Sequence, residues 1–365
     1  MKNNFLIITG GTGGHVIPAV NFFKYIERKN IEVNLLIDKR GSKYVNGINK
    51  KNIYKINYSH LSGNIFFKLK AISKLFIGFF QSLRLFIKLK PKIIVSFGSY
   101  ASFTPLICFI LLKFFYKTNL YLHEQNSVVG QTNKFFIKYS NKIFMHFNND
   151  YKTLKKYSDK ILITGLPQKE FDDNLNYDNK KYNCNFKFLV FAGSQGSIEI
   201  LTIFKEIIHE LKKISNLKNI QFIIQSPLIK QEEIRNLLIK SNFDYQIKDF
   251  FENFEQILNK TNIALCRSGA GTINDLINFK IPAIICPLAN AKDNHQYENA
   301  KILSNAECAL IVNKDKINID TIILFIKKVI HDKNFNNSLM DNFNKFQNSN
   351  ASELMWKNIK DDQKK

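Results

Sequence analysis

Three glycine-rich segments of this chain have the composition of loops that contact phosphate groups. They are Gly10–His15, Gly193–Ser197 and Arg267–Thr272, and each follows an apolar run and precedes a helical pattern. Each segment therefore predicts a turn from a strand into the start of a helix. Backbone N–H groups at a helix start bind anions, and glycine lets a ligand approach the backbone closely. One such loop is weak evidence, but three together predict a phosphorylated ligand.

Side chains suited to acid–base chemistry and to sugar binding flank these loops. His15 follows four glycines, where a histidine can act as a general base or merely cap the loop. Asp275 lies one turn into the helix after the third loop, where a carboxylate can accept hydrogen bonds from ribose hydroxyls or simply favour the helix start. His123–Asn126 and Lys292–Asn299 are polar clusters after predicted strands. We interpret both as lining a ligand site, although the second could be an ordinary capped loop.

Alternating strands and helices would position these residues. The predicted strands are the apolar, β-rich runs Phe5–Thr9, Val33–Ile37, Ile93–Phe97, Leu120–His123, Lys142–Met145, Phe188–Ala192, Phe222–Gln225, Ile263–Cys266 and Ala283–Cys286. The predicted helices include Pro18–Lys29, with Pro18 helping to start it, and Phe135–Ser140, Ile198–Ile214, Gln231–Ser241 and Ile273–Asn278. The polar stretch Asp172–Asn185 interrupts the alternation. The pattern predicts two α/β halves with parallel sheets and a ligand cleft between them.

The overall composition narrows the class of protein and its compartment. A chain of 365 residues is long enough for two domains, and a hydrophobic content of 45% excludes a disordered chain. The net charge of +23 favours an anionic partner, or it reflects a compositional drift spread over solvated faces. Five well-separated cysteines indicate a reducing compartment rather than a disulfide framework or a zinc site. We find no secretory signal and no apolar run of the ~18 residues that a spanning helix needs, so we expect a cytoplasmic protein.

One segment, Ile65–Pro91, combines apolar and basic residues and contains no acid. Its basic residues are Lys68, Lys70, Lys74, Arg84, Lys88 and Lys90. This pattern predicts one or two amphipathic helices that lie on an anionic bilayer surface. The alternative is a helix that faces the core and leaves its lysines in solvent.

The segments that carry chemistry are similar to those of one known family. They are Gly10–Ala19, Phe97–Ser102, His123–Asn126, Gly193–Ser197, Cys266–Asp275 and Asp293–Ala300, in the family's order over nearly the whole chain. The chain resembles the MurG family, the UDP-N-acetylglucosamine:lipid-linked muramyl-pentapeptide N-acetylglucosaminyltransferases. The resemblance implies a GT-B fold, with two doubly wound Rossmann-like domains facing across a cleft. The implied domains are residues 1–164 for the acceptor and the membrane, residues 165–345 for the donor, and a C-terminal helix and charged tail over 346–365.

The resemblance also implies a reaction and its partners. The reaction is inverting transfer of N-acetylglucosamine from UDP to the muramyl 4-hydroxyl of undecaprenyl-pyrophosphoryl-MurNAc-pentapeptide, the step from lipid I to lipid II in peptidoglycan synthesis. No metal or other cofactor is expected, and the chain has no Asp-x-Asp pair of the kind that holds Mn²⁺ or Mg²⁺. The implied location is the cytoplasmic face of the plasma membrane, as a peripheral protein on anionic lipid.

Individual residues take roles from the same resemblance. His15 is the leading base for the 4-hydroxyl, with Glu124 and Tyr100 as rivals or supporters. Phe251 stands where the family's backbone contacts uracil, Asp275 should bind the ribose hydroxyls, and His295 and Gln296 should contact the sugar. The complete set implied for the donor is Thr12, Gly13, Gly14, Asn126, Lys169, Ser194, Gln195, Gly196, Phe251, Ala270, Gly271, Thr272, Ile273, Asn274, Asp275, His295 and Gln296.

Three positions depart from the family pattern. Lys169 stands where the family usually has an arginine, so it keeps the charge but loses the bidentate fork. Asp275 replaces a glutamate and is shorter by one methylene. Gly98-Ser99-Tyr100 replaces Gly-Gly-Tyr. These departures bear on donor affinity and turnover, and not on the reaction class.

Two other classes of protein stay open on the residues alone. A nicotinamide-dependent oxidoreductase would use Gly11–Gly13 after the first strand and Asp38 as the acid that binds ribose. Val16 occupies the position of that fingerprint's third glycine, which weakens this alternative. A basic protein that binds nucleic acid has only the net charge in its favour, without a zinc-finger or RNA-recognition motif. We therefore expect no nucleic-acid partner.

Overall fold

The computed structural model divides the chain into two compact units. It describes residues 4–58, 65–149, 152–169, 186–191, 198–214, 217, 219–289, 291–313, 317–346 and 350–364. Unit 1 comprises Met1–Glu170 together with Ser349–Lys365, and unit 2 comprises Phe171–Asn348. The chain therefore begins and ends in the same unit.

Unit 1 is built on a parallel sheet with the strand order β3-β2-β1-β4-β5-β6-β7. Its strands are β1 Phe5–Ile8, β2 Val33–Asp38, β3 Ile53–Ile56, β4 Ile93–Ser96, β5 Asn119–Glu124, β6 Lys142–Met145 and β7 Ile161–Ile163. The order reverses between β1 and β4, as in Rossmann-like domains, and ligands of such sheets bind at the carboxyl ends of the strands beside this reversal.

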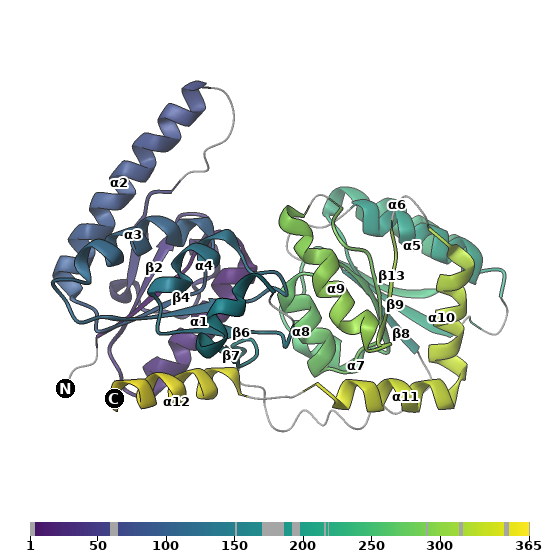
Figure 1. Cartoon of the computed structure of the whole chain (residues 1–365). Coiled ribbons are helices and arrows are strands. Elements are labelled where there is room, and N and C mark those ends of the chain that lie inside the picture. The colour runs from purple at the N-terminus through teal and green to yellow at the C-terminus, as the bar shows by residue number, and fades with distance from the viewer. Residues whose placement is uncertain are drawn as a thin grey trace. The chain divides into compact units, whose positions relative to one another are not determined.

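Helices cover both faces of this sheet (Figure 1). They are α1 Gly13–Arg28, α2 Ile65–Leu89, α3 Phe103–Leu112, α4 Gln131–Phe136 and α12 Ala351–Lys364. Phe5 and Ile7 of β1 pack with α1 and α12 on one face, whereas Leu6 and Ile8 pack with α2, α3 and α4 on the other. A strand buried on both faces needs an almost continuous apolar run, which is why the sequence predicted the central strands.

Unit 2 repeats the arrangement with the strand order β10-β9-β8-β11-β12-β13. Its strands are β8 Phe186–Phe191, β9 Ile220–Gln225, β10 Asp244–Lys248, β11 Ile263–Cys266, β12 Ala283–Ile285 and β13 Ala309–Ile311. Its helices are α5 Ile198–Leu211, α6 Leu228–Lys240, α7 Phe254–Lys260, α8 Ala270–Asn278, α9 His295–Asn305, α10 Ile319–His331 and α11 Lys333–Asn344. The order reverses between β8 and β11. The prediction of two doubly wound α/β domains is therefore confirmed.

The last helix, α12, lies on unit 1 and closes its core. The Trp356 ring lies 6.0 Å from the Phe5 ring on β1, measured between centroids. The Lys142 ammonium forms a 2.9 Å ion pair with Asp362. Figure 1 shows this helix in yellow alongside the elements of the N-terminal part of the chain.

Helix α2 confirms the predicted helix over Ile65–Pro91 and forms as a single element. Its middle lies against the end of β3, where Gly78 approaches the Asn57 carbonyl so closely that a Cβ atom would not fit. Gln81 accepts a 2.9 Å hydrogen bond from the Asn57 N–H at the same point. No helix among the described residues is long and apolar enough to cross a membrane.

Candidate active site

The first glycine segment lies at the reversal of the sheet of unit 1. It follows β1, and Phe97–Ser99 follows the neighbouring strand β4. A Cβ atom on Gly10 would lie 2.6 Å from Ala101 Cβ, and Gly11 has a φ of +83°. Both positions therefore require glycine, the first for packing and the second for its backbone conformation.

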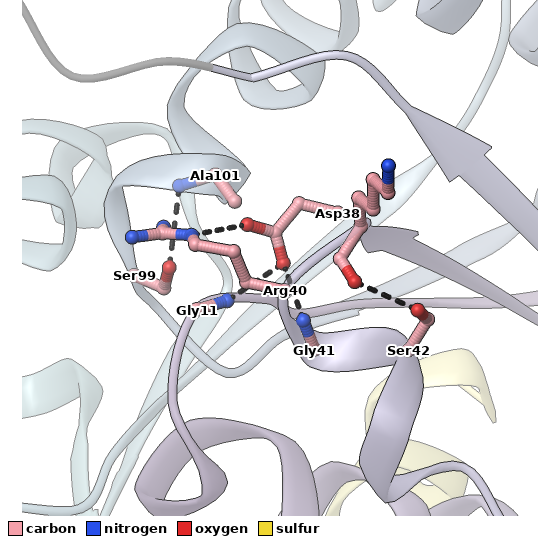
Figure 2. Close-up of polar contacts among 8 residues, drawn as sticks. Gly11, Asp38, Arg40, Gly41, Ser42, Ser99 and Ala101 are labelled. Atoms are coloured by element: carbon pink, nitrogen blue, oxygen red, sulfur yellow. Dashed lines mark hydrogen bonds and ion pairs between the residues drawn. The ribbon is translucent and has the colours of Figure 1, made fainter.

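Asp38, at the end of β2, holds this turn in place (Figure 2). One carboxylate oxygen accepts hydrogen bonds from the N–H groups of Gly11 (2.8 Å) and Gly41 (3.0 Å), and the other pairs with Arg40 at 3.0 Å. The residue is 2% exposed. Because both oxygens are bonded within the protein, Asp38 is not available to a ribose, and the oxidoreductase alternative loses its acid.

Helix α1 begins earlier than the sequence predicted. It starts at Gly13, with Thr12 in an extended conformation as the N-cap, and Pro18 lies inside the helix. The N–H groups of His15 and Val16 bond to the Thr12 carbonyl, so the glycines themselves form the first turn. The predicted start at Pro18 is wrong because proline is tolerated near a helix start without having to begin it.

His15 therefore lies in the first turn of α1 with a defined orientation. Its Nδ1 lies 2.9 Å from the Phe97 carbonyl oxygen at the end of β4. A carbonyl oxygen only accepts, so Nδ1 carries a proton, and in the neutral form of the ring the free lone pair lies on Nε2. No other described residue forms a hydrogen bond to Nε2. The ring is half-buried.

The predicted polar cluster His123–Asn126 lies at the end of β5, but most of it is buried. His123, Glu124 and Gln125 are each 1% exposed or less, and Asn126 is half-buried. Glu124 accepts hydrogen bonds on both oxygens, from the Asn126 and Gly130 backbone N–H groups among others. The cluster therefore presents Asn126 toward the surface and uses the other three residues to hold the loop.

The Glu124 carboxylate also binds Asn133, whose role the sequence reasoning missed. Asn133 donates from Nδ2 to Glu124 Oε2 at 2.9 Å and to the His123 carbonyl at 3.1 Å. Asn133 lies on α4, which the sequence predicted to start later, at Phe135. A buried carboxylate needs several hydrogen-bond donors. This requirement is the only feature of the sequence that could have predicted a donor to Glu124 from outside His123–Asn126.

Tyr100 begins a short 3₁₀ turn, Tyr100–Ser102, and is half-buried. The preceding residue, Ser99, has φ +74° and ψ 151°, a region that is populated almost only by glycine. Its hydroxyl accepts a 3.2 Å hydrogen bond from the Ala101 N–H. The serine that departs from the family's Gly-Gly-Tyr thus keeps a conformation suited to glycine.

In unit 2 the third glycine segment follows β11, beside the reversal of the sheet. Gly269 is the N-cap of α8 and is extended, so Ala270, Gly271 and Thr272 form the first helical turn. The predicted helix began at Ile273, three residues later. Four N–H groups at a helix start have no partner within the helix, and here they belong to the segment predicted to bind phosphate.

Arg267 anchors this segment, and the sequence reasoning gave it no role. The residue is 8% exposed, and its guanidinium donates to the carbonyls of Cys286 (2.9 Å) and Pro287 (3.1 Å) and pairs with Glu199. It thereby joins the ends of β11 and β12 to the first turn of α5. The position of an arginine directly after an apolar strand could have indicated this role, because a charged side chain that is buried there needs an ionic or hydrogen-bonding partner.

Asp275 lies on α8, one turn beyond the cap, and is partly exposed. Burial of its carboxyl group, together with the nearby Glu255 charge, raises the pKa of Asp275 from 3.8 to about 7. Its side chain makes no hydrogen bond to any described residue. The neighbours Ile273 and Asn274 are buried, whereas Asp275, like Thr272, is in partial contact with solvent.

The remaining predicted residues of unit 2 occupy the same edge of its sheet. Phe251 follows β10 and is 5% exposed, whereas its neighbour Phe250 is largely exposed. His295 and Gln296 begin α9 and are half-buried. The Gln296 oxygen accepts a 3.0 Å bond from the Leu288 N–H, so its amide nitrogen is directed away from that bond.

The other predicted residues are divided between the two units and a segment outside the described residues. Ser194, Gln195 and Gly196 lie outside the described residues. Thr12, Gly13, Gly14, Asn126 and the exposed Lys169 belong to unit 1, and Ala270–Asp275 belong to unit 2.

Comparison with known proteins defines the class of protein. Residues 5–145 match the N-terminal domain of glycosyltransferase family 28, and residues 188–355 match its C-terminal domain. A crystal structure of MurG from Acinetobacter baumannii has the same fold, with a TM-score of 0.77 over 98% of this chain and 99% of that chain, at 20% identity. The molecule is thus a glycosyltransferase with the GT-B fold.

Two curated relatives show to which family of glycosyltransferases the chain belongs. Both are named UDP-N-acetylglucosamine--N-acetylmuramyl-(pentapeptide) pyrophosphoryl-undecaprenol N-acetylglucosamine transferase. The protein from Rickettsia canadensis (strain McKiel) is 33% identical over 86% of each chain, and that from Pelagibacter ubique (strain HTCC1062) is 32% identical over 91% of each chain. The chain belongs to the MurG family, as the sequence motifs predicted.

Proposed function

We propose that this chain transfers N-acetylglucosamine from UDP-N-acetylglucosamine to the muramyl 4-hydroxyl of undecaprenyl-pyrophosphoryl-MurNAc-pentapeptide. The curated relatives are named for transfer of N-acetylglucosamine between this donor and this acceptor, and the chain matches 86% and 91% of their lengths. The observation that carries the proposal is the orientation of His15, whose Nδ1 bonds to the Phe97 carbonyl and whose Nε2 keeps a lone pair. A base in this state is ready to take a proton from an alcohol.

The chemistry is a single displacement. His15 Nε2 takes the proton of the 4-hydroxyl while that oxygen forms a bond to the anomeric carbon of the donor sugar. The bond from this carbon to the UDP phosphate oxygen breaks, and UDP leaves with the electron pair. Attack opposite the leaving group inverts the anomeric centre. That no metal takes part stays a prediction.

Glu124 supports this chemistry rather than competing for the proton. Its oxygens accept bonds from Asn126, Gly130 and Asn133, and it is 1% exposed. A carboxylate bonded in this way has no oxygen directed at a substrate. We assign Glu124 to holding Asn126, and Tyr100 to the rim of the site.

The donor nucleotide binds unit 2 in this proposal. The N–H groups of Ala270–Thr272 at the start of α8 bind the diphosphate, as in other anion sites at helix starts. Asp275 binds the ribose hydroxyls, Phe251 borders the uracil, and His295 with Gln296 contacts the sugar. Ser194–Gly196, Lys169 and the first glycine turn complete the set.

Unit 1 also carries the surface that we propose for the membrane. Large apolar side chains are exposed on α2, α3, α4 and the segment after α3, namely Ile72, Phe76, Ile77, Phe80, Phe103, Leu111, Phe114, Phe115 and Phe135. Exposed basic residues accompany them, namely Lys74, Arg84, Lys88, Lys113, Lys117 and Lys138. Apolar side chains with interspersed cations suit the interface of an anionic bilayer, where the lipid-linked acceptor resides. We place the protein on the cytoplasmic face of the plasma membrane.

The reaction is tested with labelled UDP-N-acetylglucosamine and the lipid-linked acceptor. We expect His15→Gln to lower kcat by about 10²- to 10⁴-fold, the usual contribution of a general base. The control is His209→Gln, because His209 is exposed on α5. Near-normal turnover of His15→Gln at saturating substrates would exclude His15 as the base, and absence of transfer by the wild type would exclude the function.

The membrane proposal is tested separately by sedimentation with vesicles. Phe114 and Phe115 are 82% and 79% exposed, and replacing both by serine should weaken binding to anionic vesicles several-fold. The matched control replaces Leu228 and Ile229 of unit 2, which are 72% and 88% exposed. Equal binding of both double variants argues against this surface. Equal binding of the wild type to neutral vesicles at high salt argues against the electrostatic part.

A further inference from the structure

We propose that Gln125 is a positioning residue that acts on His15 through a carbonyl they share. The Gln125 amide fixes the Phe97 carbonyl oxygen, and this oxygen selects the ring tautomer of His15 that can accept a proton. The inference rests on the proposed role of His15 as the base.

The chain of hydrogen bonds begins at Gly165, beyond the end of β7. His123 Nε2 lies 3.1 Å from the Gly165 carbonyl oxygen, which only accepts, so Nε2 carries the proton. Burial lowers the pKa of His123 to about 3, so the ring is neutral at physiological pH. The other nitrogen, Nδ1, must therefore act as an acceptor.

Gln125 is the donor to that nitrogen. Its Nε2 lies 3.1 Å from His123 Nδ1 and 3.0 Å from the Phe97 carbonyl oxygen. Both partners are acceptors, so the amide can adopt only one of its two orientations. Its Oε1 is buried without a hydrogen-bond partner among the described residues, and His146 Nδ1 donates to the Gln125 backbone carbonyl at 3.0 Å.

The Phe97 carbonyl is the point where Gln125 and His15 meet. Its oxygen accepts from Gln125 Nε2 and from His15 Nδ1, at 3.0 and 2.9 Å. The Phe97 ring stacks on His123, with centroids 4.9 Å apart and an angle of 25° between the planes. Phe97 and His123 are fully buried and Gln125 is 1% exposed, so the bonds that Gln125 donates form away from water, where hydrogen bonds are strongest.

The result is a connected series of hydrogen bonds from Gly165 to His15, in which Gln125 donates to both sides and the Phe97 carbonyl oxygen accepts from both sides. Every proton along it is assigned by an acceptor that cannot donate, and the last assignment leaves the lone pair on His15 Nε2. A histidine base with the wrong tautomer loses orders of magnitude in rate even when its position is unchanged. The buried Gln125 thus contributes to the reaction without contacting substrate.

The experiment combines NMR of the imidazole nitrogens with kinetics. In the ¹⁵N-histidine-labelled wild type we expect His15 to be protonated on Nδ1 and His123 on Nε2. Gln125→Met keeps the length of the side chain but removes its donors. Without the amide, the Phe97 carbonyl oxygen is no longer held toward His15 Nδ1. The variant should therefore shift His15 toward the Nε2–H tautomer and lower kcat by about 10- to 100-fold, with the KM for UDP-N-acetylglucosamine within about twofold. The control is Gln231→Met, because Gln231 also donates to a backbone carbonyl, that of Ser226, at 3.0 Å.

The outcomes separate this inference from the proposed function. A changed tautomer with a lowered kcat supports both. A changed tautomer with unchanged kcat supports the positioning role of Gln125 and removes His15 as the base. An unchanged tautomer in folded Gln125→Met overturns the inference, whatever the rate. The wild-type spectrum is decisive without any variant, because a proton on His15 Nε2 also overturns it.

Discussion

Asp275 is the residue whose replacement should separate stability from donor binding. In the native chain, burial of the carboxyl group and the Glu255 charge raise its pKa from 3.8 to about 7. The replacement Asp275→Asn keeps the shape of the side chain and removes the ionisable group. We expect the variant to be more stable than the wild type at pH 8 and to bind UDP more weakly.

The sign and size of the stability effect follow from proton linkage. Between pH 3.8 and pH 7 the native state keeps a proton that the unfolded state has lost, so the wild type becomes less stable as the pH rises. A pKa difference of about three units corresponds to roughly 4 kcal/mol. Solvent contact of the partly exposed side chain screens part of this, so we expect about 1–3 kcal/mol. The advantage of Asp275→Asn should be near zero at pH 4 and complete at pH 8.

The assay is urea unfolding of the whole chain, followed by circular dichroism from pH 4 to pH 8. Asp244→Asn is the control, because Asp244 is exposed on the edge strand β10. Calorimetry of UDP binding at pH 8 gives the second readout. Loss of a hydrogen bond to a charged group costs about 1.5–3 kcal/mol, which is roughly 10- to 100-fold in Kd. The reasoning about burial is refuted if Asp275→Asn is no more stable than the wild type at pH 8, or if its advantage is the same at pH 4.

Three further predictions concern unit 1, and the fluorescence of Trp356 during urea unfolding checks each of them. Ser99→Ala should lower the free energy of unfolding by about 0.5–1.5 kcal/mol, because it keeps the positive φ and removes the hydrogen bond from the Ala101 N–H. Ser99→Gly should stay within about 1 kcal/mol of the wild type, because glycine adopts this φ without strain. A glycine variant less stable than the alanine variant would contradict the proposed backbone strain. Gly78→Ala should cost about 1–3 kcal/mol because a Cβ atom meets the Asn57 carbonyl, and a cost no greater than that of Ser73→Ala on the exposed side of α2 would argue against this close approach. Asp38→Ala should cost about 2–3 kcal/mol and lower activity, since it leaves the Gly11 and Gly41 N–H groups without their acceptor; an effect equal to that of Asp159→Ala, at an exposed position, would refute this.

The sequence predicted the centre of each sheet better than its edges. All predicted strands exist, whereas β3, β7, β10 and β13 were not predicted, and these are the edge strands of the two sheets. An edge strand is partly exposed, as the alternating burial of Asp244–Lys248 shows, so it needs no continuous apolar run. Central strands are recognisable because both of their faces are buried.

In the candidate site, the sequence predicted the loops but not the hydrogen bonds and ion pairs that hold them in place. The glycine segments and His15 were recognisable because a turn beside a helix start requires particular residues. The bonds from Asp38 to Gly11, from Glu124 to Asn133 and from Arg267 to Glu199 were not, because these pairs stand at no characteristic spacing in the sequence. Helix starts at Gly13 and Ala270 were placed too late because glycine was taken as loop, although a first turn tolerates it.

The docking of α12 has a consequence for how the chain folds during synthesis. Unit 2 is inserted between the two segments of unit 1, so Phe171–Asn348 is translated before Ser349–Lys365. The buried Met355 and Ile359 of α12 are therefore the last apolar residues to join the core around Phe5 and Phe22. Domains generally fold as units while they are made. Unit 1 therefore starts first but is completed only after unit 2 has been made, and its nascent amino-terminal part leaves the apolar face under α12 uncovered until that helix emerges.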